Sequence, residues 1–501
     1  MIVGPEALQV RRERTAAAQR RIAKSRESWI QRWAYYRNLM SKALAFFVEP
    51  GERVLNLRCQ TGWMLKAVRP SQGVGLEITE EMVQEARKLY PEFRYEVGYP
   101  DLYQVRGEFD SILVADPGET ADLQEEFRLV HNCCNQETRV YVYAHNSLWE
   151  SAFWLAERLG IKMPQPEPSW LTEFDLRGLL ELAGFEIVKV HHVGLFPFGV
   201  PLLSYILNHW VAALPGVRSL CLFHLIVARP IFKLPKAVQP SVSVIIPCRN
   251  EEGNIRPAVA RMPELGGAIE IIFCDDMSTD RTRLEVEEVI RDFPEKNIHL
   301  VFGPGICKSK NVWAGFDAAK GEILVILDAD LTVMPEELPR FIEAIAENRG
   351  EFINGSRLVY PIPREAMKLT NRIGNVVFSY LFSLLLGQRI KDTLCGTKVL
   401  WRRDWLRMKK YVSFWGISDR WGDYDLLLGA AKLNLKIRDM PIHYQERVAG
   451  VSKMTRVLYN AGIMLKIMWK ASVKMRRYDY NLLQSLGGSQ AVSPKSGISR
   501  V

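Results

Sequence analysis

The stretch that most constrains the fold of this chain is Val325–Leu331, with the sequence VILDADL. It has the pattern of an apolar strand that ends in two carboxylates, Asp328 and Asp330. Alternate residues of a strand point to the same face, so we expect both acids to leave the strand together. Such hard oxygen ligands suit Mg²⁺ or Mn²⁺ holding a diphosphate. The alternative is that the two acids are solvated side chains at an exposed strand end. The neighbouring motifs distinguish between a metal site and this alternative.

The length and the charge of the chain set its broad class. A chain of 501 residues is too long for one ordinary hydrophobic core and predicts two domains. Its 48% hydrophobic and 25% charged residues are typical of folded protein. The net charge of +9 favours anionic partners such as nucleotide diphosphates or anionic lipid. No module of interleaved basic and aromatic residues is present, so we expect no nucleic-acid partner.

The cysteines and the N-terminal residues bear on the location of the chain. The eight cysteines, including the adjacent Cys133 and Cys134, have no CxxC or zinc-finger spacing, which favours reduced thiols in the cytoplasm. The charged helical run from Arg11 to Arg26 has no apolar core, so it is not a signal peptide. No uninterrupted apolar run reaches the ~18 residues of a spanning helix. We expect a cytoplasmic protein that binds peripherally to the cytoplasmic face of a membrane.

The first half of the chain has the pattern of an α/β domain. Residues 1–36 predict an Arg-rich helical extension that forms a solvated arm, and residues 233–240 a linker. Between them, in residues 37–232, short apolar strands alternate with helical spacers, which predicts a doubly wound parallel sheet. Within this domain the apolar stretch 193–232 is interrupted by prolines and polar residues, and we expect a pair of short helices there.

This half resembles the class I S-adenosylmethionine-dependent methyltransferases over roughly residues 40–195. The resemblance rests on the strand–loop–helix pattern VLNLRCQTGWML and on LTEFDLRGLLELAGFEIVKV, which is similar to the closing helix and strand of that family. It implies a Rossmann-like methyltransferase fold, with Gly62 in the cofactor loop and Glu77 as the acid that binds the ribose.

The cofactor loop departs from the D-x-G-x-G pattern of that family. At its three defining positions this chain has Asn56, Arg58 and Gln60. Glycine is needed where the backbone approaches the cofactor closely, and we expect the side chains of Arg58 and Gln60 to fill that space. We therefore favour a domain that has lost or weakened its S-adenosylmethionine site. An active methyltransferase, in a bifunctional chain that modifies one glycan twice, remains the alternative.

In the second half, residues 241–450, predicted strands end in polar clusters. The strand Val242–Ile246 runs into Pro247, Asn250 and Glu251, and the strand IEIIFC runs into Asp276. A glycine-bearing loop then supplies Lys308, and VILDADL follows. In open α/β sheets ligands lie beyond the carboxyl ends of the strands, so these clusters predict a ligand site.

The second half resembles glycosyltransferase family 2, most of all the branch that uses dolichyl or polyprenyl phosphate. The motifs that carry the resemblance occur in the family's order: SVIIPCRNEEGNI, CDDMSTD, CKSKNVWAGFDAAKGEILVILDADL, GSRLV, LLLGQRIKDTLCGTKVLWRRD and WGDYDLLLGAAKLNLKIRDMPIHYQERVAGVSKM. The resemblance implies a GT-A fold and a nucleotide-diphosphate sugar donor, with Asp328 and Asp330 on the metal. It implies donor-binding roles for Pro247, Asn250, Glu251, Asp276, Lys308, Asp328 and Arg357.

Two acids and two cations near the end of this domain concern the acceptor. Asp423 matches the general base of many family 2 enzymes, and Asp425 matches an acid of the polyprenyl-phosphate branch, whose acceptor needs no base. Either acid could instead be a helix N-terminal residue that the helix dipole favours. Arg447 and Lys453 match a phosphate-binding motif of that branch, or belong to a solvated basic loop.

The segment 451–501 predicts an amphipathic helix and a C-terminal tail. Lys466, Lys470, Lys474 and Arg477 recur at helical spacing beside apolar residues, which is typical of a helix lying in a membrane interface. A core-packing helix with a solvated stripe is the alternative. Taken together, we expect metal-dependent sugar transfer from a nucleotide-diphosphate sugar to a polyprenyl phosphate at the membrane surface. A hydroxyl acceptor with Asp423 as base, and a scaffold with two decayed sites, are the competing hypotheses.

Overall fold

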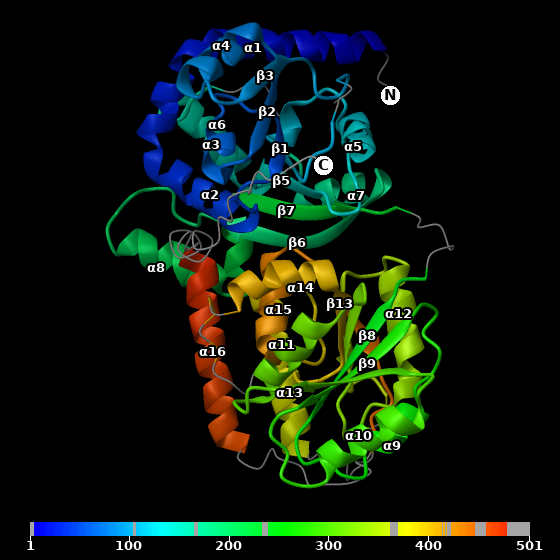
Figure 1. Cartoon of the computed structure of the whole chain (residues 1–501). Coiled ribbons are helices and arrows are strands. Elements are labelled where there is room, and N and C mark those ends of the chain that lie inside the picture. Colours follow the sequence, from blue (N-terminus) through cyan, green and yellow to red (C-terminus); the bar gives the residue numbers. More distant parts are fainter. Residues whose placement is uncertain are drawn as a thin grey trace, which may run out of the picture. The chain divides into compact units, whose positions relative to one another are not determined.

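The computed structural model describes residues 5–103, 107–164, 169–232, 239–360, 369–412, 414–415, 417, 422–445 and 457–477. The chain divides into two compact units. The first contains residues 1–235 with the short segments 383–389 and 434–436, and the second contains the remainder. Each unit is built on a seven-stranded sheet with helices packed on it (Figure 1). The predicted α/β class with two domains is therefore confirmed.

The first sheet has the strand order β3-β2-β1-β4-β5-β7-β6. Strands β1 to β5 are parallel, and β7 runs antiparallel to both β5 and β6. The strands are β1 (Arg53–Leu57), β2 (Gln72–Glu77), β3 (Arg94–Val97), β4 (Ser111–Ala115), β5 (Arg139–His145), β6 (Phe185–Val193) and β7 (Phe223–Pro230).

Strand β7 corrects the expectation of two short helices in 193–232. Only the first part of that stretch is helical, with α8 (Leu203–His209), η3 (Val211–Ala213) and η4 (Val217–Leu220). All residues of β7 are buried, because it lies between β5 and β6. A strand that is buried on both faces has a continuous apolar sequence, and periodicity alone does not separate it from a buried helix.

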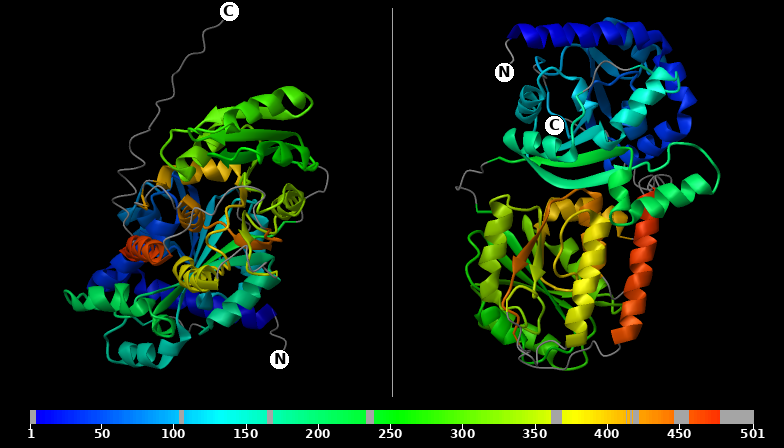
Figure 2. Two further views of the ribbon diagram at one scale, coloured as in Figure 1. Left: turned by 90° about the horizontal axis from the view of Figure 1, so that it is seen from below. Right: turned by 180° about the vertical axis from the view of Figure 1, so that it is seen from behind.

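Helices cover both faces of this sheet (Figures 1 and 2). The predicted N-terminal extension is helical, but it is not a solvated arm: Thr15, Ala16, Gln19, Ala23 and Arg26 of α1 are buried at helical spacing. The main helices are α1 (Pro5–Arg32), α2 (Ala34–Phe47), α3 (Trp63–Val68), α4 (Glu80–Leu89), α5 (Leu123–Asn132), α6 (Glu150–Arg158) and α7 (Glu173–Leu182).

The second sheet has the order β10-β9-β8-β11-β13-β12-β14. Strands β10, β9, β8 and β11 are parallel, β13 is antiparallel to β11 and β12, and β12 is parallel to β14. The strands are β8 (Val242–Cys248), β9 (Ile269–Asp275), β10 (Asn297–Phe302), β11 (Ile323–Ile326), β12 (Phe352–Ser356), β13 (Lys398–Trp401) and β14 (Ile437–Pro441).

The helices of the second unit are α9 (Ile255–Ala260), α10 (Thr282–Asp292), α11 (Lys308–Ala318), α12 (Leu338–Ala346), α13 (Leu369–Leu386), α14 (Arg402–Met408), α15 (Gly422–Lys432) and α16 (Val457–Arg477). The long helices α13 and α16 lie side by side in both views of Figure 2. Among the described residues, no helix combines the length and the apolar character needed to cross a bilayer.

Candidate active site

Three neighbouring parallel strands of the second unit bring the predicted polar clusters to one edge. Strands β9, β8 and β11 are adjacent in the sheet, so their carboxyl ends meet. Asp276 follows β9, Asn250 follows β8, and Asp328 follows β11. The chain order reverses between β8 and β11, which is where open α/β sheets form their ligand crevice.

The loop after β8 is tied to the start of α10. Asn250 has a left-handed backbone, with φ of 55°, and its Oδ1 accepts a hydrogen bond of 2.8 Å from the backbone N–H of Thr279. The N–H of Glu251 donates to Thr282 Oγ1 at 2.8 Å. Pro247 is the penultimate residue of β8. These bonds fix the loop at the end of the strand.

Asp276 is buried and organises the loop after β10. Its Oδ1 accepts the N–H of Gly305 at 2.9 Å, and its Oδ2 lies 3.5 Å from Nη1 of Arg249. A Cβ on Gly303 would lie 2.1 Å from Oδ1 of Asn311, so only glycine lets this loop pass. Both oxygens of Asp276 therefore have partners within the protein.

Lys308, the first residue of α11, pairs with Asp328 at the end of β11. Its Nζ lies 2.5 Å from Asp328 Oδ1. Burial lowers the pKa of Lys308, but the carboxylates of Asp328, Asp423 and Asp330 outweigh it and raise the pKa overall. The ammonium group is therefore firmly charged beside three acids, as a phosphate-binding cation needs to be.

The two acids of the D-x-D motif have different partners. Strand β11 ends at Ile326, and Oδ1 of Asp330 accepts the hydroxyl of Thr332 at 2.8 Å. A Cβ on Gly396 would lie 2.2 Å from Oδ2 of Asp328, so glycine permits the close approach there. Both acids act electrostatically on the ammonium group of Lys308, and both offer the hard oxygens that divalent cations prefer.

Lys398 is a site residue that the sequence did not indicate. Its side chain is fully buried, and its Nζ lies 2.9 Å from Oδ1 of Asp423. It begins β13, opposite Ile326 of β11, so an antiparallel strand brings it to the carboxyl end of the parallel ones. Lys398 belongs to the sequence motif CGTKVLW. A lysine beside an apolar run, however, does not indicate an ion pair with a helix that is distant in the sequence.

The structure brings Asp423 into this cluster and points Asp425 elsewhere. The two acids lie two positions apart on α15, which is about 200° around a helix. Asp425 is buried, its Oδ1 has no hydrogen-bond partner among the described residues, and Lys310 is the cation that acts on it. Burial raises the pKa of Asp425 to about 7.

Arg357 is held by a carboxylate that the sequence analysis passed over. Its Nε and Nη2 donate to Asp392 at 2.7 and 2.9 Å, and Asn375 donates to the same acid at 2.7 Å. Burial opposes ionisation of Asp392, but Arg357 outweighs it and lowers the pKa of that acid. The buried ion pair of Arg357 and Asp392 supports the backbone where β12 ends. The predicted phosphate ligands Arg447 and Lys453 lie outside the described residues.

The cofactor loop of the first unit keeps the backbone of a glycine-rich loop. Arg58 and Gln60 have φ of 51° and 55°, and Gly62 has φ of 83°. The expectation that Arg58 fills the cofactor space is wrong. Its guanidinium turns away into the protein and forms two bonds of 2.7 Å with the buried Glu126.

Gln60 and Glu77 are engaged within the protein. The Gln60 amide donates to Asp116 at 2.8 Å, and Glu77 accepts the N–H groups of Gln60 and Ile78 at 2.7 and 3.0 Å. Glu77 is 0% exposed. Arg26 of α1 is also buried here and acts electrostatically on Glu77. Burial and these bonds leave Glu77 covered in this structure, which argues against a ribose bound at this acid.

The second unit has the mixed seven-stranded sheet of a GT-A fold, with a charged lysine and acidic side chains at the ends of its parallel strands. Residues 243–422 match the family model described as glycosyl transferase family 2. This match falls largely within the second unit, where the resemblance to the same family was found in the sequence.

Several curated proteins are similar to part of the chain. The dolichol-phosphate mannosyltransferase of Pyrococcus furiosus is 39% identical over 120 residues, which are 24% of this chain and 33% of that protein. The dolichyl-phosphate hexose transferase of Haloferax volcanii is 29% identical over 217 residues, 42% of this chain and 86% of that protein. The undecaprenyl-phosphate 4-deoxy-4-formamido-L-arabinose transferase of Pectobacterium carotovorum is 38% identical over 112 residues, 21% of this chain and 34% of that protein. The chain thus spans only about a third of the length of the first and third of these relatives.

Similar solved structures include a S-adenosylmethionine-dependent methyltransferase of Thermotoga maritima. It has 15% identity and a TM-score of 0.36, and the match covers 43% of this chain and 99% of that one. The putative methyltransferase solved with the Trm112 activator of Haloferax volcanii has 17% identity and a TM-score of 0.33, over 42% of this chain and 96% of that one.

Proposed function

We propose that the second unit transfers a sugar from a nucleotide-diphosphate sugar to a polyprenyl phosphate. The observation that carries this proposal is the group formed by Lys308, Asp328 and Asp423 at the carboxyl ends of the parallel strands. It lies in a family 2 domain whose characterised relatives are named for transfer to dolichyl or undecaprenyl phosphate.

The donor half of the reaction uses the strand ends. Asn250, Glu251 and Asp276 bind the nucleoside, and Lys308 moves from Asp328 to the donor phosphates. Asp328 and Asp330 would hold Mg²⁺ or Mn²⁺, which neutralises the leaving diphosphate when it is bound. The fixed charges at this edge stabilise the leaving group without reorganisation during the reaction.

The acceptor half needs no general base. A phosphate monoester has its second pKa near 6, so at pH 7 it is mostly a dianion and acts as its own nucleophile. Attack from the face opposite the diphosphate inverts the sugar. Asp423 is already paired with Lys398, which favours an electrostatic and positioning role over proton abstraction. By the family resemblance, Arg447 and Lys453 bind the acceptor phosphate.

Exposed apolar side chains support an encounter with lipid. On α13, Ile373, Val376, Val377 and Tyr380 are each at least half exposed and recur at helical spacing. On the neighbouring α16, Leu465 and Trp469 are also more than half exposed. The opposite side of α16 is a buried stripe of Met464, Ile467, Ala471 and Met475. The helix therefore combines core packing with a second apolar surface, which suits a peripheral membrane protein.

Supplying labelled donor with either undecaprenyl phosphate or a panel of free glycans tests the proposal. Label that extracts into organic solvent supports the lipid acceptor, and Arg447→Ala should then lower acceptor use by roughly tenfold to a hundredfold, since a charge-assisted bond contributes ~1.5–3 kcal/mol. Label found only in water-soluble product, and abolished by Asp423→Asn, would instead establish a hydroxyl acceptor with Asp423 as its base.

A further inference from the structure

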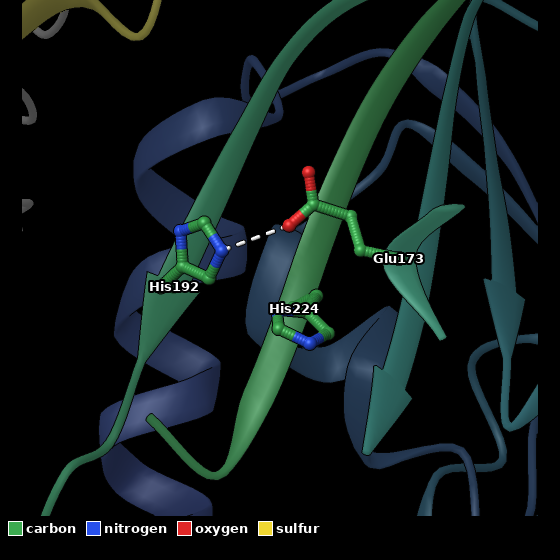
Figure 3. A group of neighbouring side chains, drawn as sticks. All are labelled: Glu173, His192 and His224. Carbon is green, nitrogen blue, oxygen red and sulfur yellow. Dashed lines mark hydrogen bonds and ion pairs between the residues drawn. The ribbon is translucent and has the colours of Figure 1, made fainter. Parts of the chain in front are cut away.

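We propose that Glu173, His192 and His224 of the first unit form a binding site for a divalent transition metal of the zinc type. One potential ligand atom from each side chain lies within 4.8 Å of the other two (Figure 3). The site is separate from the cofactor loop and from the transferase site, and it takes no part in the function proposed above.

The fold of the sheet brings the three residues together. His192 and His224 are directly opposite each other in the antiparallel pairing of β6 and β7, which places both side chains on one face. The same face is covered by α7, whose Leu176 and Leu180 join the hydrophobic core of this sheet. Glu173 is the first residue of α7, so the start of the helix adds a carboxylate to the two rings.

Polar contacts hold the carboxylate of Glu173 between His192 and Arg177. Nε2 of His192 lies 3.0 Å from Oε2 of Glu173, and Nη2 of Arg177 lies 2.8 Å from Oε1 of the same carboxylate. The hydrogen bond from His192 is the main cause that lowers the pKa of Glu173 to about 2. Burial lowers the pKa of His224 to about 4.

His224 has a polar atom that the surrounding protein does not satisfy. The residue is 5% exposed, and its Nδ1 has no hydrogen-bond partner among the described residues. Leaving a buried polar atom unpaired costs about 1–3 kcal/mol. The ring of His224 lies perpendicular to that of His192, with 4.9 Å between the ring centroids. A metal ion held between these rings offers a partner for a nitrogen of His224.

Two imidazoles and one carboxylate are ligands that Zn²⁺ prefers, and three protein ligands leave one position for water. Two ligand atoms of a tetrahedral zinc ion lie about 3.4 Å apart, so the partly exposed side chains have to move by about 1 Å in total to complete the set. Glu173 and His192 have such side chains, with exposures of 25% and 13%, and they leave a path for the ion. Arg177 holds the second oxygen of Glu173 and orients the carboxylate, as outer partners of metal ligands do.

Titration of the full-length, chelator-treated and desalted protein with Zn²⁺ tests the site. Calorimetry measures the number of Zn²⁺ ions bound per chain. In a second titration Co²⁺ replaces Zn²⁺, and its absorption spectrum reports the coordination of the ion. We expect one Zn²⁺ per chain at this site, with affinity at least a hundredfold lower in Glu173→Gln and in His192→Gln. His299→Gln, which removes an exposed histidine of β10, and Asp330→Asn, in the transferase site, should both leave this binding unchanged.

Thermal unfolding gives a second measurement. Zn²⁺ should raise the Tm of the wild-type chain and not that of Glu173→Gln, because only a ligand that binds the folded state stabilises it. His224→Gln should also lose binding, and if that variant does not fold, the partly exposed Glu173→Gln decides the question. Equal zinc binding by the wild type and all three site variants, or none by the wild type, would overturn the proposal and leave a Glu173–His192 ion pair as the role of these residues.

Discussion

The ammonium group of Lys398 lies 2.9 Å from the carboxylate of Asp423, and the lysine side chain is completely buried. The same lysine donates a hydrogen bond to the carbonyl oxygen of Cys395. Asp423 in turn is one of the acids that raise the pKa of Lys308. The buried lysine therefore fixes the position of an acid that acts on Lys308.

Replacing the buried lysine should show that it acts as a positioning residue. In Lys398→Gln the charge partner of Asp423 is lost, and we expect kcat to fall by about tenfold or more with little change in the KM of the donor. Lys409→Gln, at an exposed lysine that pairs with Asp317, is the matched control. In the double variant with Asp423→Asn the two losses should be strongly non-additive, because the residues form one pair. Independent, additive effects would contradict the coupling.

Donor binding should depend on a divalent metal held by Asp328 and Asp330. We expect Asp330→Asn to abolish the effect of Mn²⁺ on donor affinity while the circular dichroism spectrum stays that of the wild type. Asp292→Asn, an exposed acid paired with Arg256, controls for the loss of one charge. Calorimetric titration with UDP- and GDP-sugars, with and without Mn²⁺, measures the effect. Full turnover in Asp330→Asn, or in excess EDTA, would show that the metal is dispensable.

The full-length chain should bind S-adenosylmethionine weakly or not at all. Glu77 is buried with both oxygens bound to backbone N–H groups, and the Gln60 side chain spans the loop to Asp116. Isothermal titration calorimetry of the intact protein is the direct measurement. A dissociation constant in the low micromolar range, about −8 kcal/mol, would refute this expectation and make a working methyltransferase domain the better hypothesis.

The exposed apolar residues of α13 and α16 should govern membrane binding. We expect Val377→Ser combined with Trp469→Ser to lower the fraction bound to anionic liposomes at low salt several-fold, because the buried apolar area is lost. Leu182→Ser, at a residue that is 72% exposed in the first unit, is the control for an exposed apolar side chain. Flotation with liposomes measures the bound fraction. If the wild type shows no affinity, α16 is a core-packing helix only.

The buried Asp425 should make stability depend on pH. Burial raises its pKa to about 7. The folded chain keeps a proton that the unfolded chain releases near pH 4, so the free energy of unfolding falls as pH rises from about 4 to about 7. Asp425→Asn should therefore raise the Tm at pH 8, with roughly 4 kcal/mol as the upper limit, and change it little at pH 4. An equal gain in Tm at pH 4 and at pH 8 would exclude this cause.

Much of the chain was predictable because its signals are local. The apolar pattern of the sequence predicts the strand that ends before Asp328. The polar turn residues that follow β8, β9 and β11 in the sequence predict the order of the polar clusters. Parallel strands joined by helices then have to bring their carboxyl ends to one edge. For that reason the α/β class, the two domains and the positions of Asn250, Asp276, Lys308 and Asp328 followed from the sequence alone.

Tertiary structure decided the contacts between residues that no local pattern relates. Antiparallel pairing with β11 brings Lys398 to Asp423, and rotation around α15 sends Asp425 to the opposite side. Arg58 keeps the backbone of a glycine loop, yet its side chain turns to Glu126. Desolvation penalises every arrangement that leaves a buried charge unpaired. Strand register and side-chain direction then decide which of several possible partners the charge takes. Those quantities are set by the packed fold and are absent from the sequence pattern.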